Sequence, residues 1–196
     1  MDVKLKVCGM KFPENIEEIC TLKPNYLGFI FWNNSQRKYS DETMIDIPKD
    51  IKKVGVFVNE TIEEIKKRID QFNLGVVQLH GKESPEFCNE VKALHVEVIK
   101  AFSIDDTFNF DTLKDYENAV DIFLFDTKGK QPGGNGITFD WELLDQYQLT
   151  KPFFLSGGIG LTSVDAIKTF LNSHKAKYCY GIDVNSRFEK KTGYKN

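Results

Sequence analysis

The feature that most constrains the fold of this chain is a regular alternation of short apolar runs with longer amphipathic stretches. The apolar runs are rich in β-branched and aromatic residues, as the strands of a helix-covered parallel sheet require. They occupy residues 5–8, 26–31, 54–58, 75–79, 96–101, 121–125, 153–155 and 178–182. This alternation predicts an α/β fold in which the runs are parallel strands.

Amphipathic periodicity and capping signals mark the stretches between these strands. We predict helices at residues 13–22, 40–46, 61–72, 84–93, 111–118, 140–147 and 162–173. Thr61 is followed closely by two glutamates, and Ser84 stands before Pro85 and Glu86. A capping residue followed by proline or acidic groups is typical of the start of a helix.

The order of these elements predicts a closed barrel. Eight strands alternating with seven helices, without a long linker, favour a single (β/α)8 TIM-barrel domain over residues 1–196. The alternative, an open doubly wound sheet, would carry a G-x-G-x-x-G turn after its first strand, but Gly9 is followed by Met-Lys-Phe-Pro. The chain stops near the expected start of an eighth helix, so we expect this helix to be absent or truncated. Apolar faces of the first and last strands would then be exposed or buried in an oligomer.

Charge, hydropathy and cysteine content exclude several classes of protein. The formal net charge of −3 argues against nucleic-acid binding, which needs a clustered excess of Lys and Arg. No apolar run approaches the ~20 residues that span a bilayer, and no signal peptide opens the chain. The four cysteines form no CxxC pair. We therefore expect a cytoplasmic protein without nucleic-acid or membrane partners, as a monomer or homodimer.

Polar residues collect where the predicted strands end. In a (β/α)8 barrel the active site lies at the carboxyl ends of the strands. The residues at these ends are Cys8-Gly9, 33–37, Asn59, His80-Gly81, Asp126-Thr127 with the glycine-rich 128–136, 156–158 and 183–186. The three histidines lack the spacing of metal ligands, and His95 and His174 fall away from this edge. We predict a site without a metal ion or other cofactor.

A phosphate site is predicted after the seventh and eighth strands. Gly157 and Gly158 precede the helix expected near Thr162, and glycines allow backbone N–H groups to approach an anion at a helix start. Residues 185–187 would supply the second half, because phosphate sites of this fold often join these two loops. A pair of glycines can also be an ordinary turn, but its position after the seventh strand favours phosphate binding.

Cys8 and Asp126 are the candidate acid–base pair. Cys8 ends the first strand, where a core thiol and a functional thiol are equally good interpretations. Asp126 closes an apolar run, and a buried carboxylate is costly unless it is paired or functional. A thiol and a carboxyl group together supply a general base and a general acid. Arg37 is either a surface residue or, at this edge, a partner for a substrate carboxylate or phosphate.

These residues lie in motifs that resemble the phosphoribosylanthranilate isomerase family. The resemblance runs in order from residue 4 to residue 194. Its motifs are K-V-C-G at 6–9, G-F-I-F at 28–31, S-Q-R at 35–37, V-G-V-F-V-N at 54–59, V-Q-L-H-G at 77–81, D-T at 126–127, G-G-N-G at 133–136, F-D-W at 139–141, L-S-G-G at 155–158 and D-V-N-S at 183–186.

The resemblance implies an Amadori rearrangement of N-(5-phosphoribosyl)anthranilate to the corresponding 1-deoxyribulose phosphate, without a cofactor. It implies that Asp126 is the general acid and that Cys8, as a thiolate of depressed pKa, is the general base. Arg37 would bind the anthranilate carboxylate, and Asp183 would lie near the sugar hydroxyls. His80 would line the rim without transferring a proton. The phosphate would be bound by Gly157, Gly158 and Ser186.

Two positions depart from the family pattern, and two other functions compete with this one. Lys11 replaces a usual Thr, and Arg187 replaces a common Gly in the loop expected to bind phosphate. A different phosphosugar barrel enzyme would need Lys and Glu, or metal-ligating His and Asp, at the strand ends. A non-catalytic phosphosugar-binding barrel would lack the thiol or the carboxyl group, and both are present.

Overall fold

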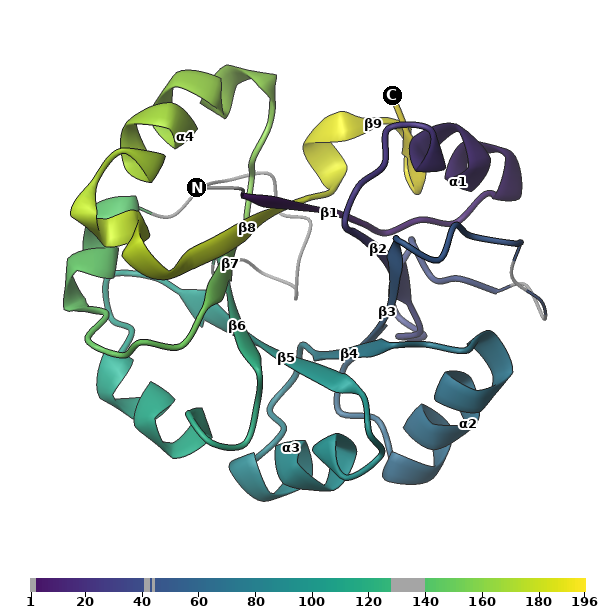
Figure 1. Ribbon diagram of the computed structural model, residues 1–196, viewed down its shortest axis with the longest axis horizontal. Coiled ribbons are helices and arrows are strands. Elements are labelled where there is room, and N and C mark those ends of the chain that lie inside the picture. The colour runs from purple at the N-terminus through teal and green to yellow at the C-terminus, as the bar shows by residue number, and fades with distance from the viewer. Residues whose placement is uncertain (1–2, 41–42, 44, 128–139) are drawn as a thin grey trace.

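The computed structural model describes residues 3–40, 43, 45–127 and 140–196. Its strands form a closed, all-parallel barrel in sequence order (Figure 1), which confirms the predicted fold class. The strands are β1 (Lys4–Cys8), β2 (Tyr26–Ile30), β3 (Lys52–Phe57), β4 (Val76–Leu79), β5 (Glu97–Ile104), β6 (Ile122–Thr127), β7 (Phe153–Leu155) and β8 (Cys179–Val184). The pairing of β1 with β8 closes the barrel and sets Lys6 beside Asp183. The motif residues 133–136 and Phe139 lie outside the described residues.

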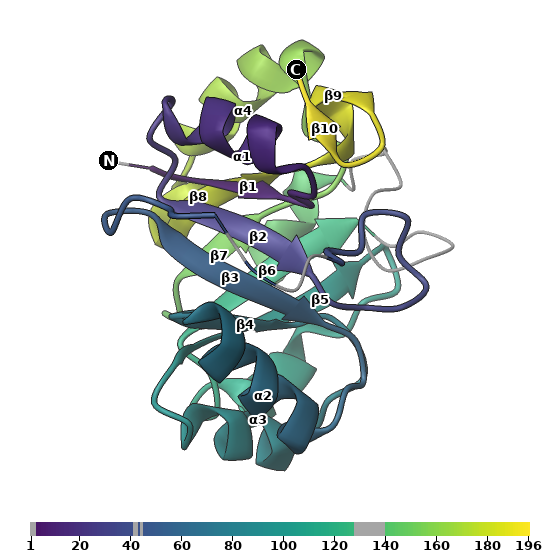
Figure 2. The ribbon, with the colours of Figure 1, turned by 90° about the vertical axis from the view of Figure 1, so that its right-hand side faces the viewer.

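Helices cover the outside of the barrel, as Figures 1 and 2 show. The α-helices are α1 (Pro13–Cys20), α2 (Ile62–Phe72), α3 (Pro85–Lys92) and α4 (Val164–Leu171). Short 3-10 helices are η1 (Phe110–Tyr116), η2 (Trp141–Gln146), η3 (Leu161–Ser163), η4 (His174–Tyr178) and η5 (Ser186–Phe188). The predicted caps are confirmed, because the Thr61 side chain accepts a hydrogen bond from Glu64 N and the Ser84 side chain accepts one from Phe87 N. None of the described helices is long and apolar enough to cross a bilayer.

The predicted helix at 40–46 is wrong, since none of the described residues of this segment is helical. The space outside the barrel that this helix would have covered is filled by Tyr39, whose ring packs against Phe29, Phe31 and Phe72. A buried aromatic side chain therefore gives the cover that the helix would have supplied. The helices predicted at 111–118 and 140–147 form as 3-10 turns, and each begins at a side-chain cap, from Asn109 and Asp140 respectively.

Two layers of buried side chains make up the core. One layer fills the space between the strands and the helices, and the other lies inside the barrel. Successive side chains of a strand point to opposite faces, so Val7 belongs to the outer layer while Lys6 and Cys8 face the barrel interior. The interior layer is Cys8, Tyr26, Val54, Val56, Val76, Ile99, Ala101, Ile122, Leu124 and Phe154.

The segment after β8 is a short hairpin rather than an α-helix. It consists of η5 followed by β9 (Glu189–Lys191) and β10 (Tyr194–Lys195), which pair antiparallel. Figures 1 and 2 show the hairpin in yellow beside α1. Of the outward-facing apolar residues of β1 and β8, Leu5 is 38% exposed, whereas Val7 and Val184 are buried. The association expected through this face stays a prediction.

Candidate active site

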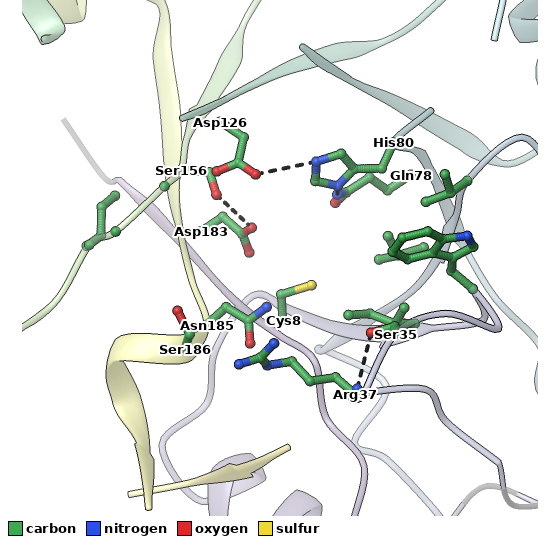
Figure 3. A pocket seen from close by; sticks show the side chains of 17 residues that line it. Cys8, Ser35, Arg37, Gln78, His80, Asp126, Ser156, Asp183, Asn185 and Ser186 are labelled. Atoms are coloured by element: carbon green, nitrogen blue, oxygen red, sulfur yellow. Dashed lines mark hydrogen bonds and ion pairs between the residues drawn. The ribbon is translucent and has the colours of Figure 1, made fainter. Parts of the chain in front are cut away.

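One cavity at the carboxyl ends of the strands brings together all eight residues predicted for the site (Figure 3). These are Cys8, Arg37, His80, Asp126, Gly157, Gly158, Asp183 and Ser186. The remaining lining residues are Ile30, Trp32, Ser35, Val56, Val58, Gln78, Ser156, Ile159 and Asn185. The cavity lies where parallel strands from distant parts of the sequence end side by side, so its residues meet because of the barrel.

Cys8 is buried at the end of β1, against β2. A Cβ at Gly28 would lie 2.8 Å from its sulfur, so a glycine at that position makes room for the thiol. Burial raises the pKa of the Cys8 thiol, although the positive charges of Lys6 and Lys195 lower it. The expected depression of this pKa is therefore wrong for the substrate-free protein, because removing the thiolate from water outweighs the charges beside it.

A buried ion pair between Lys6 and Asp183 lies next to the Cys8 thiol. Lys6 Nζ donates to Asp183 Oδ1 at 2.8 Å, and the Ser156 hydroxyl donates to Asp183 Oδ2 at 3.2 Å. The Lys6 side chain is 0% exposed and that of Asp183 is 7% exposed. Burial would lower the pKa of Lys6, but the neighbouring Asp183 and Cys8 hold it above its ordinary value. Lys6 was not among the predicted site residues. It stands two residues before Cys8 on the same strand, so the two side chains lie on one face of that strand.

The carboxyl group of Asp126, at the end of β6, lies next to His80 (Figure 3). Asp126 Oδ1 accepts a hydrogen bond from Thr127 N, and Asp126 Oδ2 lies 3.4 Å from His80 Nε2. The other ring nitrogen, His80 Nδ1, is 3.0 Å from Gln78 Nε2. If the Gln78 amide donates to Nδ1, the proton of the neutral ring sits on Nε2 and faces Asp126. His80 lines the cavity at the end of β4, as expected, and is also a direct neighbour of the candidate acid. Gln78, which contacts His80, was not among the predicted site residues.

The loop after β7, where the phosphate site is predicted, contains a pair of glycines. Gly157 and Gly158 both have positive φ, 89° and 62°, which side-chain-bearing residues rarely adopt. A Cβ at Gly157 would collide with Thr127 Oγ1. Arg187 lies against the same loop, since a Cβ at Gly160 would be 3.0 Å from Arg187 Cβ. The replacement of the family's glycine therefore packs the aliphatic stem of Arg187 against the loop that follows β7.

Arg37 lines the cavity, but two of its nitrogens are already engaged. Its Nε and Nη2 donate to Glu189 Oε1 and Oε2, both at 2.8 Å, in the parallel geometry of a bidentate pair. The Ser35 hydroxyl accepts a hydrogen bond from Arg37 N at 3.1 Å (Figure 3). Arg37 can therefore still offer a substrate the other edge of its guanidinium, formed by Nη1 and the second N–H of Nη2.

The described residues contain no group of three or more His, Cys, Asp or Glu side chains that could hold a metal ion. The fold and the cavity define a (β/α)8 barrel with a thiol, a carboxyl group, an arginine and a pair of glycines at one mouth. This arrangement is suited to an enzyme that uses acid–base chemistry.

Comparison with known proteins identifies the family. The family model for N-(5'phosphoribosyl)anthranilate (PRA) isomerase matches residues 5–196. The isomerase of Parabacteroides distasonis is 42% identical over 197 residues, covering 98% of this chain and 87% of the relative. That of Phocaeicola vulgatus is 41% identical, covering 94% and 88%. The chain belongs to the N-(5'-phosphoribosyl)anthranilate isomerase family, which confirms the resemblance and makes it an isomerase.

Solved structures agree with this assignment. The crystal structure of the Thermus thermophilus phosphoribosyl anthranilate isomerase aligns with a TM-score of 0.84 at 25% identity, covering 99% of this chain and 92% of that one. A second family structure is a complex with reduced 1-(o-carboxyphenylamino)-1-deoxyribulose 5-phosphate. It aligns with a TM-score of 0.76 at 26% identity, again covering 99% and 92%.

Proposed function

We propose that this chain catalyses the Amadori rearrangement of N-(5'-phosphoribosyl)anthranilate to 1-(2-carboxyphenylamino)-1-deoxyribulose 5-phosphate, a step of tryptophan biosynthesis. The observation that carries the proposal is that Cys8 and Asp126 line one cavity of a family barrel, together with Arg37 and the glycine pair after β7. All four cysteines are free thiols, which suits a cytoplasmic enzyme. A monomer or homodimer is the assembly that we expect.

Asp126 acts first, as the general acid. Its protonated carboxyl group donates a proton to the ring oxygen of the ribose, the bond from C1 to that oxygen breaks, and a Schiff base with the anthranilate nitrogen forms. The position of Asp126 on the cavity wall supports this role, because a general acid must lie within hydrogen-bond reach of the atom that it protonates. The imidazole of His80 beside it holds the carboxyl group toward the cavity.

Cys8 acts second, as the general base. The thiolate removes the proton from C2, the electrons form the C1–C2 double bond, and the Schiff-base nitrogen becomes the neutral amine of an enolamine. The enol oxygen then loses its proton and C1 gains one, which gives the ketone. The thiolate is the minor form in the free protein, and the ammonium of Lys6 is the strongest of the charges that favour it.

The remaining groups hold the substrate. Gly157, Gly158 and Ser186 bind the phosphate through the loops after β7 and β8. Arg37 binds the anthranilate carboxylate. Asp183 accepts hydrogen bonds from sugar hydroxyls, since each of its oxygens keeps a lone-pair site beside the bonds from Lys6 and Ser156.

The direct test is turnover. The purified protein is mixed with N-(5'-phosphoribosyl)anthranilate, and the loss of its anthranilate fluorescence is followed with and without EDTA. We expect catalytic loss of fluorescence at the same rate in both samples. Tight binding of the substrate without turnover would identify a non-catalytic phosphosugar-binding barrel, and inhibition by EDTA would show that a metal ion takes part.

A further inference from the structure

Glu189 on the C-terminal hairpin is shared by two cations. Its carboxylate accepts two hydrogen bonds from Arg37, and Lys195 Nζ donates to its Oε1 at 2.8 Å. Lys195 Nζ also donates to Asn185 Oδ1, at 2.7 Å, and Asn185 lines the cavity. The hairpin thus reaches the active site through an uninterrupted chain of charged and polar side chains.

These groups are nearly removed from water. The side chains of Glu189 and Lys195 are 6% and 1% exposed, and that of Arg37 is 19% exposed. Burial alone would raise the pKa of Glu189, but the hydrogen bonds and charges of Arg37 and Lys195 lower it to about 2. Glu189 is therefore an anion at neutral pH. It offsets the charge of one of its two cationic partners. Burial lowers the pKa of Lys195, although the hydrogen bond and charge of Glu189 raise it.

The hairpin is fixed in place by backbone contacts. Asn15 of α1 accepts a hydrogen bond from Lys195 N at 2.6 Å and donates one to Lys195 O at 3.1 Å. Gly193, whose φ of 80° suits a glycine, donates its N–H to Glu189 Oε1 at 3.0 Å. The positions of Glu189 and Lys195 relative to the barrel are thus set from both strands of the hairpin.

We infer that Glu189 and Lys195 are positioning residues of the site that binds the aromatic carboxylate of the substrate. Glu189 holds the Nε–Nη2 edge of the Arg37 guanidinium, so that the Nη1–Nη2 edge faces the substrate carboxylate. Lys195 offsets the charge of Glu189, because a neutral Arg37–Glu189 pair alone would attract a second carboxylate only weakly. The inference rests on the proposed function, and it makes the hairpin a determinant of selectivity for a carboxylated ring.

A comparison of two substrates tests this role. The variants Glu189→Gln and Lys195→Met are assayed with N-(5'-phosphoribosyl)anthranilate and with N-(5'-phosphoribosyl)aniline, which lacks only the carboxylate. Product formation is followed by chromatography for both. For Glu189→Gln we expect KM for the carboxylated substrate to rise about 10- to 100-fold with little change in kcat, and the kinetic constants for the aniline substrate to stay within about twofold of wild type. Lys195→Met also removes a charge that lowers the pKa of Cys8, so it should lower kcat for both substrates and, in addition, raise KM for the carboxylated one alone. Lys190→Met, an exposed change on the same hairpin, is the matched control.

Each outcome separates the inference from the proposed function. An equal loss with both substrates, or no loss with either, would overturn the positioning role. Circular dichroism and thermal unfolding identify a variant that fails to fold, and Glu189→Gln then serves as the milder change. If the wild-type protein turns over neither substrate, the proposed function fails. The positioning role is then tested by calorimetric affinities for reduced product analogues with and without the carboxylate.

Discussion

The buried pair of Lys6 and Asp183 predicts a large and specific loss of stability. In Lys6→Met the carboxylate of Asp183 keeps only the Ser156 hydroxyl as a partner, at a position where its side chain is 7% exposed. Removing one partner of a buried ion pair costs about 3–5 kcal/mol, because the other charge stays in a poorly polar environment. With an m-value of about 2 kcal/mol/M, the urea midpoint should fall by roughly 2 M.

Urea unfolding followed by circular dichroism measures this loss, and two variants make the result specific. In Lys6→Met/Asp183→Asn no charge is left buried, so we expect the double variant to be more stable than the single one. Lys52→Met breaks the pair with Glu97, but Lys52 is 49% exposed, so it should cost less than about 1 kcal/mol. A loss below about 1 kcal/mol in Lys6→Met, or a double variant less stable than the single one, would refute the reasoning.

Three further predictions concern the chemistry of the site. Burial raises the pKa of Cys8, so the rate of its alkylation by iodoacetamide should increase about tenfold per pH unit between roughly pH 7 and 9. Mass spectrometry of the peptide that contains Cys8 measures this rate. A rate that stops rising below about pH 8 would contradict the prediction. Gln78→Leu removes the hydrogen bond to His80 Nδ1, so kcat in the fluorescence assay should fall about tenfold. An unchanged kcat would count against a role for this contact in catalysis. The pKa of Glu189 is lowered from 4.5 to about 2, so its contribution to stability is complete above pH 4.5 and is lost as the pH falls toward 2. The Tm of Glu189→Gln should therefore depend less on pH in this range than the Tm of the wild type. An equal dependence would show that Glu189 is not a source of the loss of stability in acid.

The sequence predicted the barrel and the site because both follow from local patterns. Continuous apolar runs predict buried parallel strands, and the carboxyl ends of such strands converge, so Cys8, Asp126 and Asp183 could be assigned to one cavity. The helix predicted at 40–46 failed because its place is taken by Tyr39, whose partners lie on other elements. Sequence periodicity does not report such packing.

The electrostatics of the site could not be predicted from the sequence. The bond between Arg37 and Glu189 joins residues 152 positions apart, and that between Lys6 and Asp183 joins residues 177 positions apart. The pKa of Cys8 depends on how completely the barrel buries its thiol and on where Lys6 and Lys195 place their charges. Each of these quantities is a property of the closed barrel, so a motif that names the thiol does not fix its pKa.

The central claim is that a thiol and a carboxyl group facing one barrel mouth act as base and acid on the same sugar. The most direct test is to measure kcat for the fluorescent anthranilate substrate in Cys8→Ala and in Asp126→Asn, with folding checked by circular dichroism. Positioned acid–base groups contribute about 10²- to 10⁴-fold each, so we expect each variant to lose turnover by that factor while still binding the substrate. Wild-type turnover in either folded variant would contradict the account.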